Sequence, residues 1–147
     1  MKTILLTALA AFLTGCQTLA APSAFETFSG QAYRGRIESA GELVSTHTYF
    51  TSDNGTITGR YEAYEEEAEA PTLGTLSACR EHSPRLLQCR WEDKYGHGLA
   101  GFFFSPDHSS FFGAWSADHT TRANSEVFMW YGEASDDMRA DAPLTCD

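Results

Sequence analysis

The chain has 147 residues, with 20 acidic side chains against ten lysines and arginines and a formal charge of −10. This length fits one domain. Such an acidic chain offers no basic surface to neutralise phosphates, which argues against nucleic acid as a partner and against unaided binding to an anionic membrane. With 42% apolar and 13% aromatic residues, the chain is expected to bury a core rather than remain disordered.

The N-terminal residues have the pattern of an export signal. Lys2 is followed by a nearly unbroken apolar stretch over residues 4–13, which ends in Leu13-Thr14-Gly15-Cys16. A helix needs roughly 20 apolar residues to cross a bilayer, so this shorter stretch predicts a signal peptide. Leu13-Thr14-Gly15-Cys16 resembles the lipobox of bacterial lipoproteins.

That resemblance implies how the N-terminus is processed. Residues 1–15 would be removed as a lipoprotein signal peptide, and Cys16 would be acylated to form the new N-terminus. Each buried methylene of an acyl chain contributes about 0.8 kcal/mol, so several chains hold a protein at a membrane. In this family, an aspartate directly after the cysteine signals retention at the inner membrane. The residue here is Gln17, which favours the outer membrane, with the protein facing the periplasm or the surface. The alternative is a secreted protein with a chance cysteine at this place.

Residues 16–24 carry no charge, and we expect them to form a tether behind the lipid. Loss of the signal peptide removes Lys2 and leaves nine basic against 20 acidic residues, a formal charge of −11. The acidity therefore belongs to the folded domain and its tail.

From Phe25 onward, short β-prone runs alternate with turn residues. This spacing predicts an all-β domain over residues 25–132, followed by an acidic C-terminal tail over residues 133–147. Because the connectors are short, as at Asp53-Asn54-Gly55, we expect an eight-stranded antiparallel up-and-down meander, closed or nearly closed into a barrel. The runs cover approximately residues 27–37, 42–50, 56–64, 72–80, 85–92, 98–104, 110–116 and 126–131.

Three of these runs share the pattern apolar, x, small, x, aromatic. Ile57, Gly59 and Tyr61 would lie on one face of their strand, and residues 87–91 and 111–115 repeat the arrangement. A small residue beside a large ring suits the interior of a narrow barrel. In strand number and aromatic content the domain resembles the small calycin-type barrels, such as the avidin and lipocalin families, although no binding residue can be matched to them.

Residues 102–104 and 127–131 are apolar on both faces of their strands. Either the C-terminal tail covers their outer faces, or these faces form an exposed aromatic patch that binds a partner.

An exported protein with Cys79, Cys89 and Cys146 in addition to Cys16 is expected to form a disulfide. Cys79 and Cys89 flank the His82-Ser83-Pro84 turn, which favours a bridge across the hairpin. Against it, an unbroken register that pairs residues 79 and 89 sends Leu76 to the outer face. The alternative pairs Cys146 with Cys79 or Cys89.

Alternating hairpins sort the connectors to two ends of the barrel. One end gathers acidic residues and two histidines, in which Glu65, Glu67, His97 and His119 form a weak candidate metal site. The alternative is a solvated acidic loop. The other end gathers Asp53, His82, Asp107 and His108, which suggest either acid/base chemistry or, more simply, turn residues.

The inward rings of Tyr61, Trp91, Trp115 and Trp130 could line an apolar ligand pocket at the barrel mouth, or they could fill the barrel completely. No motif for a catalytic nucleophile or for a cofactor is present. The sequence thus predicts a non-enzymatic binding module of the cell envelope, which binds the membrane through its lipid and takes an unknown protein or a small apolar ligand. An inhibitor of a lysozyme-like or proteolytic enzyme, or an envelope structural or assembly factor, are the alternatives.

Overall fold

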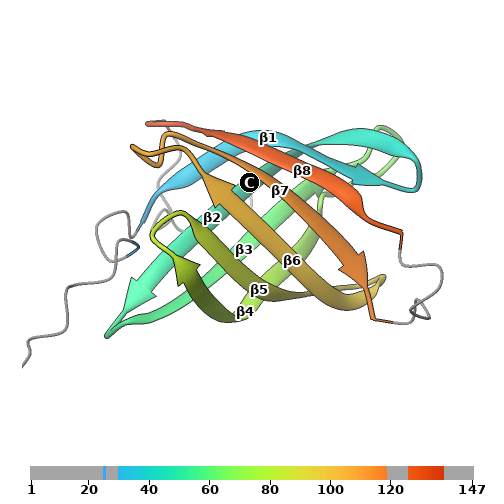
Figure 1. The fold of residues 1–147 in the computed structure, drawn as a ribbon. Helices are drawn as coiled ribbons and strands as arrows, with labels where there is room; N and C mark the ends of the chain where they lie inside the picture. Colours follow the sequence, from blue (N-terminus) through green and yellow to red (C-terminus); the bar gives the residue numbers. More distant parts are fainter. Residues whose placement is uncertain (1–24, 26–29, 119–125, 138–147) are drawn as a thin grey trace, which may run out of the picture.

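The computed structural model describes residues 25, 30–118 and 126–137, and in these it shows eight strands and no α-helix. Each strand pairs antiparallel with the next, and β8 pairs with β1 to close the barrel (Figure 1). The predicted fold is therefore confirmed. The strands are β1 (Ala32–Ser39), β2 (Glu42–Asp53), β3 (Thr56–Tyr64), β4 (Thr72–Ser83), β5 (Leu86–Asp93), β6 (Gly96–Phe104), β7 (Ser110–Ala117) and β8 (Phe128–Ala134).

Some strand ends differ from the prediction. β1 begins at Ala32, whereas the run was predicted from residue 27, and residues 26–29 lie outside the described part. β4 continues to Ser83, because Ser83 still pairs with Leu86 across a two-residue turn. β8 continues to Ala134, so the predicted boundary between barrel and tail at residue 132 falls inside a strand. No helix of the described residues is long and apolar enough to span a membrane.

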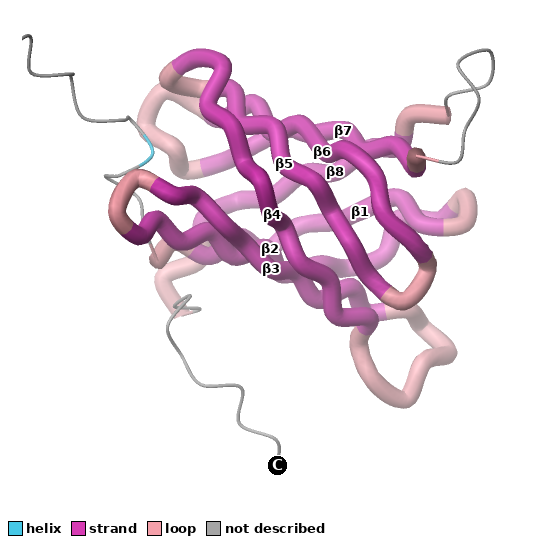
Figure 2. The backbone as a smooth tube through the Cα atoms, turned by 90° about the horizontal axis from the view of Figure 1, so that it is seen from below, coloured by secondary structure: helices cyan, strands magenta, loops and turns pink. Residues whose placement is uncertain are grey.

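Two hairpin turns require positive backbone angles. Asn54 and Gly55 have φ of 50° and 77°, as a type I′ turn demands, and this turn was predicted. Ala40 and Gly41 have φ of 52° and 84° and connect β1 to β2 in the same way. An alanine in this conformation costs about 1 kcal/mol, so Ala-Gly is not a pair that predicts a turn of this type. Figure 2 shows the barrel from below, with turns at both ends.

The interior is packed solid at one end of the barrel. There the side chains of Tyr33, Phe50, Phe102, Phe104 and Phe111, which we call the aromatic plug, are at most 3% exposed. Their rings meet mostly edge to face, with centroids 5.2–6.3 Å apart, an arrangement that stabilises aromatic pairs beyond simple burial.

Two further groups complete this closed end. The ring of Phe25 packs on that of Phe104 and stacks on the imidazole of His108 at 5.4 Å between centroids. The Tyr33 hydroxyl donates a hydrogen bond to the carbonyl oxygen of His108 at 2.8 Å. Burial raises the pKa of Tyr33, so this hydroxyl keeps its proton.

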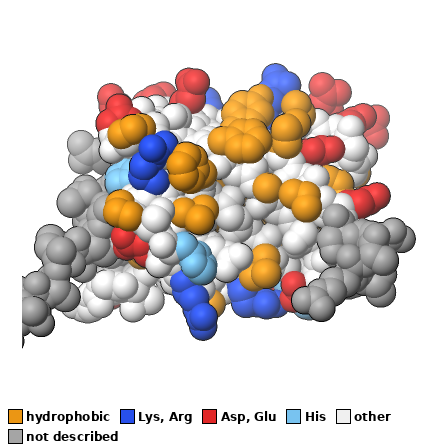
Figure 3. All heavy atoms as spheres, in the orientation of Figure 1, with side chains coloured by type: hydrophobic (Ala, Val, Ile, Leu, Met, Phe, Trp, Pro, Cys, Tyr) orange, Lys and Arg blue, Asp and Glu red, His pale blue; other side chains and the backbone are white. Residues whose placement is uncertain are grey.

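The outer face of β5 to β8 carries a row of exposed apolar side chains. Leu86 pairs with Phe103, Phe103 with Phe112, and Phe112 with Tyr131, so the four residues form one line across four strands. Phe103 and Phe112 are 50% and 58% exposed. Figure 3 shows apolar side chains gathered on this face. Residues 138–147 of the predicted tail lie outside the described part.

The predicted disulfide between Cys79 and Cys89 is present. A β-bulge resolves the objection to it, because Ala78 and Cys79 together stand opposite Cys89. Ala78 has a φ of 46°, and beyond the bulge Leu76 pairs with Trp91 and points into the core with 1% exposure. The bulge therefore lets the bridge form without moving Leu76 outward. Cys146 lies outside the described residues.

We expect loss of this bridge to lower the free energy of unfolding by about 2–3 kcal/mol, the value for closing a loop of this length. The test compares urea unfolding of the oxidised protein, the reduced protein and the Cys79→Ala, Cys89→Ala double variant. Reduced protein and variant should unfold at similar, lower urea concentrations. Identical midpoints for the oxidised and reduced protein would show that the bridge contributes nothing.

Candidate functional site at the open end of the barrel

The end of the barrel opposite the aromatic plug is hollow. A cavity of about 650 Å³ opens there, between the connections that follow β1, β3 and β5. Tyr61, Trp91, Trp115 and Trp130, the four residues predicted for a ligand pocket, all line it. The other lining residues are Ile37, Ser39, Ala40, Glu42, Val44, Ala63, Glu65, Glu66, Glu67, Thr72, Asp93 and Tyr95.

Glycines on neighbouring strands allow two of the rings to lie flat across the barrel wall. Tyr61 pairs with Gly74, and a Cβ on Gly74 would come within 2.1 Å of the Tyr61 ring. The ring therefore crosses β4, and its hydroxyl donates to Asp93 Oδ2 on β5 at 2.7 Å. Burial and this hydrogen bond raise the pKa of Tyr61, so the hydroxyl stays a donor.

Trp91 repeats this arrangement one hairpin further along. It pairs with Gly98, where a Cβ would lie 2.8 Å from the indole nitrogen. The indole crosses β6, and its Nε1 donates to the carbonyl oxygen of Ser116 on β7 at 3.0 Å. Hydrogen bonds from Tyr61 on β3 to β5, and from Trp91 on β5 to β7, thus hold the floor of the cavity in place.

The other two indoles are also bonded within the protein. Trp115 Nε1 donates to the carbonyl oxygen of Glu38 at 3.0 Å, and Trp130 Nε1 donates to Thr48 Oγ1 at 3.1 Å. The rings of Trp91 and Trp115 meet edge to face at 5.0 Å. Because every indole N–H already has an acceptor, the tryptophans offer the cavity aromatic surface and no hydrogen-bond donor.

Carboxylates surround the mouth of the cavity. Its lining includes Glu42, Glu65, Glu66, Glu67 and Asp93, which we call the acidic rim. Among the described residues that line the cavity, none is a lysine, arginine or histidine.

Tyr95 bonds two of the rim carboxylates. Tyr95 donates its hydroxyl to Glu65 Oε2 at 3.0 Å and its backbone N–H to Asp93 Oδ1 at 2.8 Å. Lys94 follows Asp93 in this turn, and its Nζ lies 4.7 Å from the centroid of the Tyr95 ring. Glu65 and Asp93 are thus held in place beside the aromatic floor.

Thr72 lies at the start of β4 on the wall of the cavity. Its side chain is buried, with the residue 2% exposed, and its hydroxyl has no hydrogen-bond partner. A buried hydroxyl without a partner costs about 1–3 kcal/mol. Buried polar groups in native proteins are usually satisfied, which makes this one a candidate contact for a bound molecule.

The weak candidate metal site gains no support from the described residues. Glu65 and Glu67 line the cavity, whereas His97 is exposed and its Nε2 lies 3.8 Å from Asp118 Oδ2. His119 lies outside the described part. Among the described residues no three histidine, cysteine or acidic side chains are grouped as metal ligands would be.

At the closed end, the four candidate acid/base residues are bonded to turns and neighbouring strands. Asp107 accepts hydrogen bonds from the hydroxyls of Ser105 and Ser109, which lower its pKa to about 2. Asp53 accepts from the side chain of Asn54 in its own turn. The remaining two are histidines: His82 Nε2 lies 3.2 Å from Gln88 Oε1, and His108 Nε2 lies 3.1 Å from the carbonyl oxygen of Pro84. The structure supports the interpretation of these residues as turn and strand contacts.

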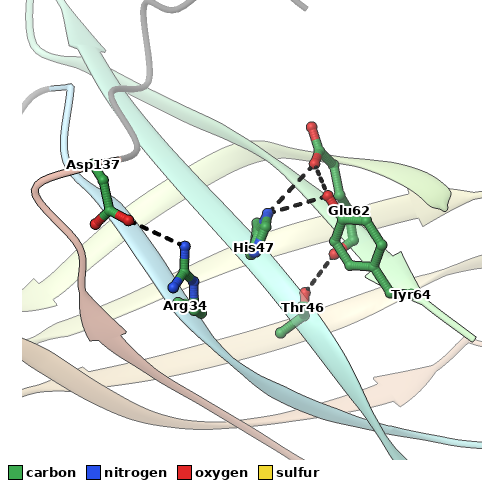
Figure 4. A network of polar contacts seen from close by, with 6 residues as sticks. All are labelled: Arg34, Thr46, His47, Glu62, Tyr64 and Asp137. Carbon is green, nitrogen blue, oxygen red and sulfur yellow. Dashed lines mark hydrogen bonds and ion pairs between the residues drawn. The ribbon is translucent and has the colours of Figure 1, made fainter.

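A polar network on the outer wall was not predicted (Figure 4). Tyr64 donates its hydroxyl to Glu62 Oε2 at 2.6 Å, and its oxygen lies 3.1 Å from His47 Nδ1. Burial lowers the pKa of His47 and, together with the bond to Glu62, raises that of Tyr64. The spacing of Glu62 and Tyr64 on one strand face was the available signal. The network ties β2 to β3, and Thr46 adds a bond to the Glu62 carbonyl oxygen.

Several lining residues were also missed. Glu42 and Val44 were overlooked because the turn at Ala40 gave no strong signal, so the first hairpin was not assigned to the acidic end. Ala63 and Thr72 lie inward at the end of β3 and the start of β4. Strict alternation from Tyr61 would have identified Ala63.

Sequence comparison adds no relative whose function could be carried over. No family model matches the chain, and no curated protein matches it. What this protein binds is therefore inferred from the chemistry of the cavity itself.

Proposed function

We propose that this protein is a non-enzymatic binding module of the cell envelope, anchored at the outer membrane through lipid on Cys16, which holds a small ligand with an apolar body in the open end of its barrel. The observation that carries the proposal is the cavity of about 650 Å³, which is lined by all three tryptophans of the chain. Ligand sites in proteins have volumes of about 300–1,000 Å³ and mainly apolar walls.

The two ends of the barrel support this proposal. The aromatic plug fills one end, so a ligand would enter and leave at the acidic rim. At the rim, Asp93 and Glu65 accept hydrogen bonds from tyrosines, and at the closed end the histidines and aspartates bond to turns and strands. A binding role fits this arrangement better than acid/base catalysis, which needs a group that exchanges its proton with a substrate, whereas burial and the bond to Asp93 raise the pKa of Tyr61 and keep its proton in place.

Filling the cavity tests the proposal. Val44 is 8% exposed and lines the cavity. We expect Val44→Phe to raise the Kd of the neutral fluorescent compound N-phenyl-1-naphthylamine at least tenfold, because the added ring would occupy the space that the compound needs. The measurement is energy transfer from the tryptophans to this compound in the full-length chain.

The matched control is Val127→Phe, which adds the same atoms at a position 65% exposed and outside the cavity lining. It should bind as the unaltered protein does. Binding that is absent from the unaltered protein, or equally strong in Val44→Phe, would reject the cavity as the site.

A protein partner is the second candidate, favoured by the exposed row that includes Phe103 and Phe112. An envelope assembly factor would use this row, whereas an enzyme inhibitor would insert the acidic rim into a basic cleft. Capture of one partner from envelope extract that is lost in Phe112→Ser but kept in Val44→Phe would favour the assembly role. Loss only in the Glu65→Gln, Glu66→Gln, Glu67→Gln triple variant would favour inhibition.

A further inference from the structure

We infer that the ligand of this cavity is an organic cation: an amine or quaternary ammonium group attached to an apolar or aromatic body. This inference rests on the proposed function, since it specifies what the cavity binds. Three features carry it: the charge of the rim, the use of the indole and tyrosine donors within the protein, and the aromatic floor; the unpartnered hydroxyl of Thr72 adds a site for a polar group.

The first feature is the negative charge of the cavity lining. Five of the sixteen lining residues are acidic, and none of the described ones is basic. A cavity with low-dielectric walls and charges of one sign concentrates ions of the opposite sign. A carboxylate or phosphate ligand would be repelled by this rim, and a neutral ligand without hydrogen-bond donors would gain nothing from it.

The hydrogen bonds of the lining residues are the second feature that favours a cation. All three indole N–H groups are used within the protein, and the hydroxyls of Tyr61 and Tyr95 donate to Asp93 and Glu65. What remains at the rim is mainly carboxylate oxygen, which accepts hydrogen bonds and cannot donate them. A ligand must therefore bring its own donors or a positive charge.

The aromatic floor supplies the third feature. The faces of indole and phenol rings attract cations, tryptophan most strongly. The rim already holds one such contact, since the Lys94 ammonium lies 4.7 Å from the Tyr95 ring centroid. A ligand cation above the tryptophans would gain the same attraction in a more enclosed place.

Thr72 is independent of the acidic residues. Its buried hydroxyl has no partner within the protein and belongs to a residue of the cavity wall. A polar group on the ligand, either a donor or an acceptor, would satisfy it, which a purely hydrocarbon ligand cannot do.

The experiment compares three compounds of nearly the same shape. Benzyltrimethylammonium is the cation, neopentylbenzene is its neutral carbon analogue, and phenylmethanesulfonate is an anion of similar size. Binding to the full-length chain is followed by tryptophan fluorescence, which reports directly on the site because all three tryptophans line the cavity. At low ionic strength we expect the cation to bind at least tenfold more tightly than the neutral analogue, and the anion to bind least.

Two variants of equal charge change test the rim. In the Glu65→Gln, Glu66→Gln, Glu67→Gln variant the preference for the cation over the neutral analogue should fall to threefold or less. The Asp53→Asn, Glu81→Gln, Glu133→Gln variant, with three changes outside the cavity lining, should keep it. Raising the salt to 0.5 M should weaken binding of the cation but not of the neutral analogue, because salt screens charges.

The outcomes separate the two proposals. Equal or tighter binding of the neutral analogue, abolished by Val44→Phe, would overturn the cation inference and leave the cavity as a ligand site. Cation binding that is unchanged in the rim variant would also overturn it. If none of the three compounds, nor N-phenyl-1-naphthylamine, binds in a manner sensitive to Val44→Phe, both proposals fail.

Discussion

Replacing Gly35 with alanine is expected to lower the free energy of unfolding by about 3 kcal/mol, because the barrel closes at this residue. Gly35 on β1 pairs with Gly132 on β8. A Cβ on Gly35 would lie 1.8 Å from the carbonyl oxygen of Tyr131 and 2.6 Å from the Cα of Gly132. Both obstacles are backbone atoms, so no side chain can move aside, and the two strands would have to separate.

Gly101→Ala is the matched control. It makes the same substitution inside strand β6, where an added Cβ meets no atom within 4 Å. We expect its stability to be unchanged or up to about 1 kcal/mol higher, since alanine restricts the unfolded chain. Urea unfolding followed by tryptophan fluorescence measures both variants. Equal midpoints for the two would show that the β1–β8 closure tolerates a wider separation than the structure has.

Phe102→Ala is expected to cost about 3–5 kcal/mol, the range for deleting a large aromatic side chain from a core. Phe102 is fully buried in the aromatic plug, and its ring contacts those of Phe50, Phe111 and Trp130 at 5.0–5.2 Å. Its removal would leave a hole among rigid rings that cannot collapse to fill it.

The next residue in the chain gives the control. Phe103 points outward, is 50% exposed, and has the Arg85 guanidinium 4.4 Å from its ring centroid. Phe103→Ala should cost less than about 1 kcal/mol, because little burial and one exposed cation contact are lost. A loss for Phe103→Ala as large as that for Phe102→Ala would mean that the outer row is covered in solution by another part of the chain or by a second molecule.

Much of the barrel could be predicted from short-range signals in the sequence. Strand number and order followed from the spacing of turn residues, and the inward faces followed from alternation. Ile57, Leu87 and Phe111 are buried as the shared strand pattern required. The turn at Asn54-Gly55 has the predicted backbone angles because asparagine and glycine tolerate positive φ.

Features that depend on how particular strands pair could not be predicted. The bulge at Ala78 and Cys79 is visible only in the register of β4 against β5. The role of Gly35 depends on its position against Gly132, almost a hundred residues later, and nothing local marks the pair. The sequence likewise could not decide whether the tryptophans fill the barrel or line a cavity, since that depends on where Gly74 and Gly98 let Tyr61 and Trp91 lie.

The aromatic plug also has a consequence for how this molecule can change. Because the tightly packed rings lie at one end, amide groups there should open to hydrogen exchange only with global unfolding, while those around the acidic rim open locally. Substitutions at the rim then disturb few buried contacts. The barrel can therefore acquire a different ligand preference at its open end without a large loss of stability, as loops on a rigid scaffold generally allow.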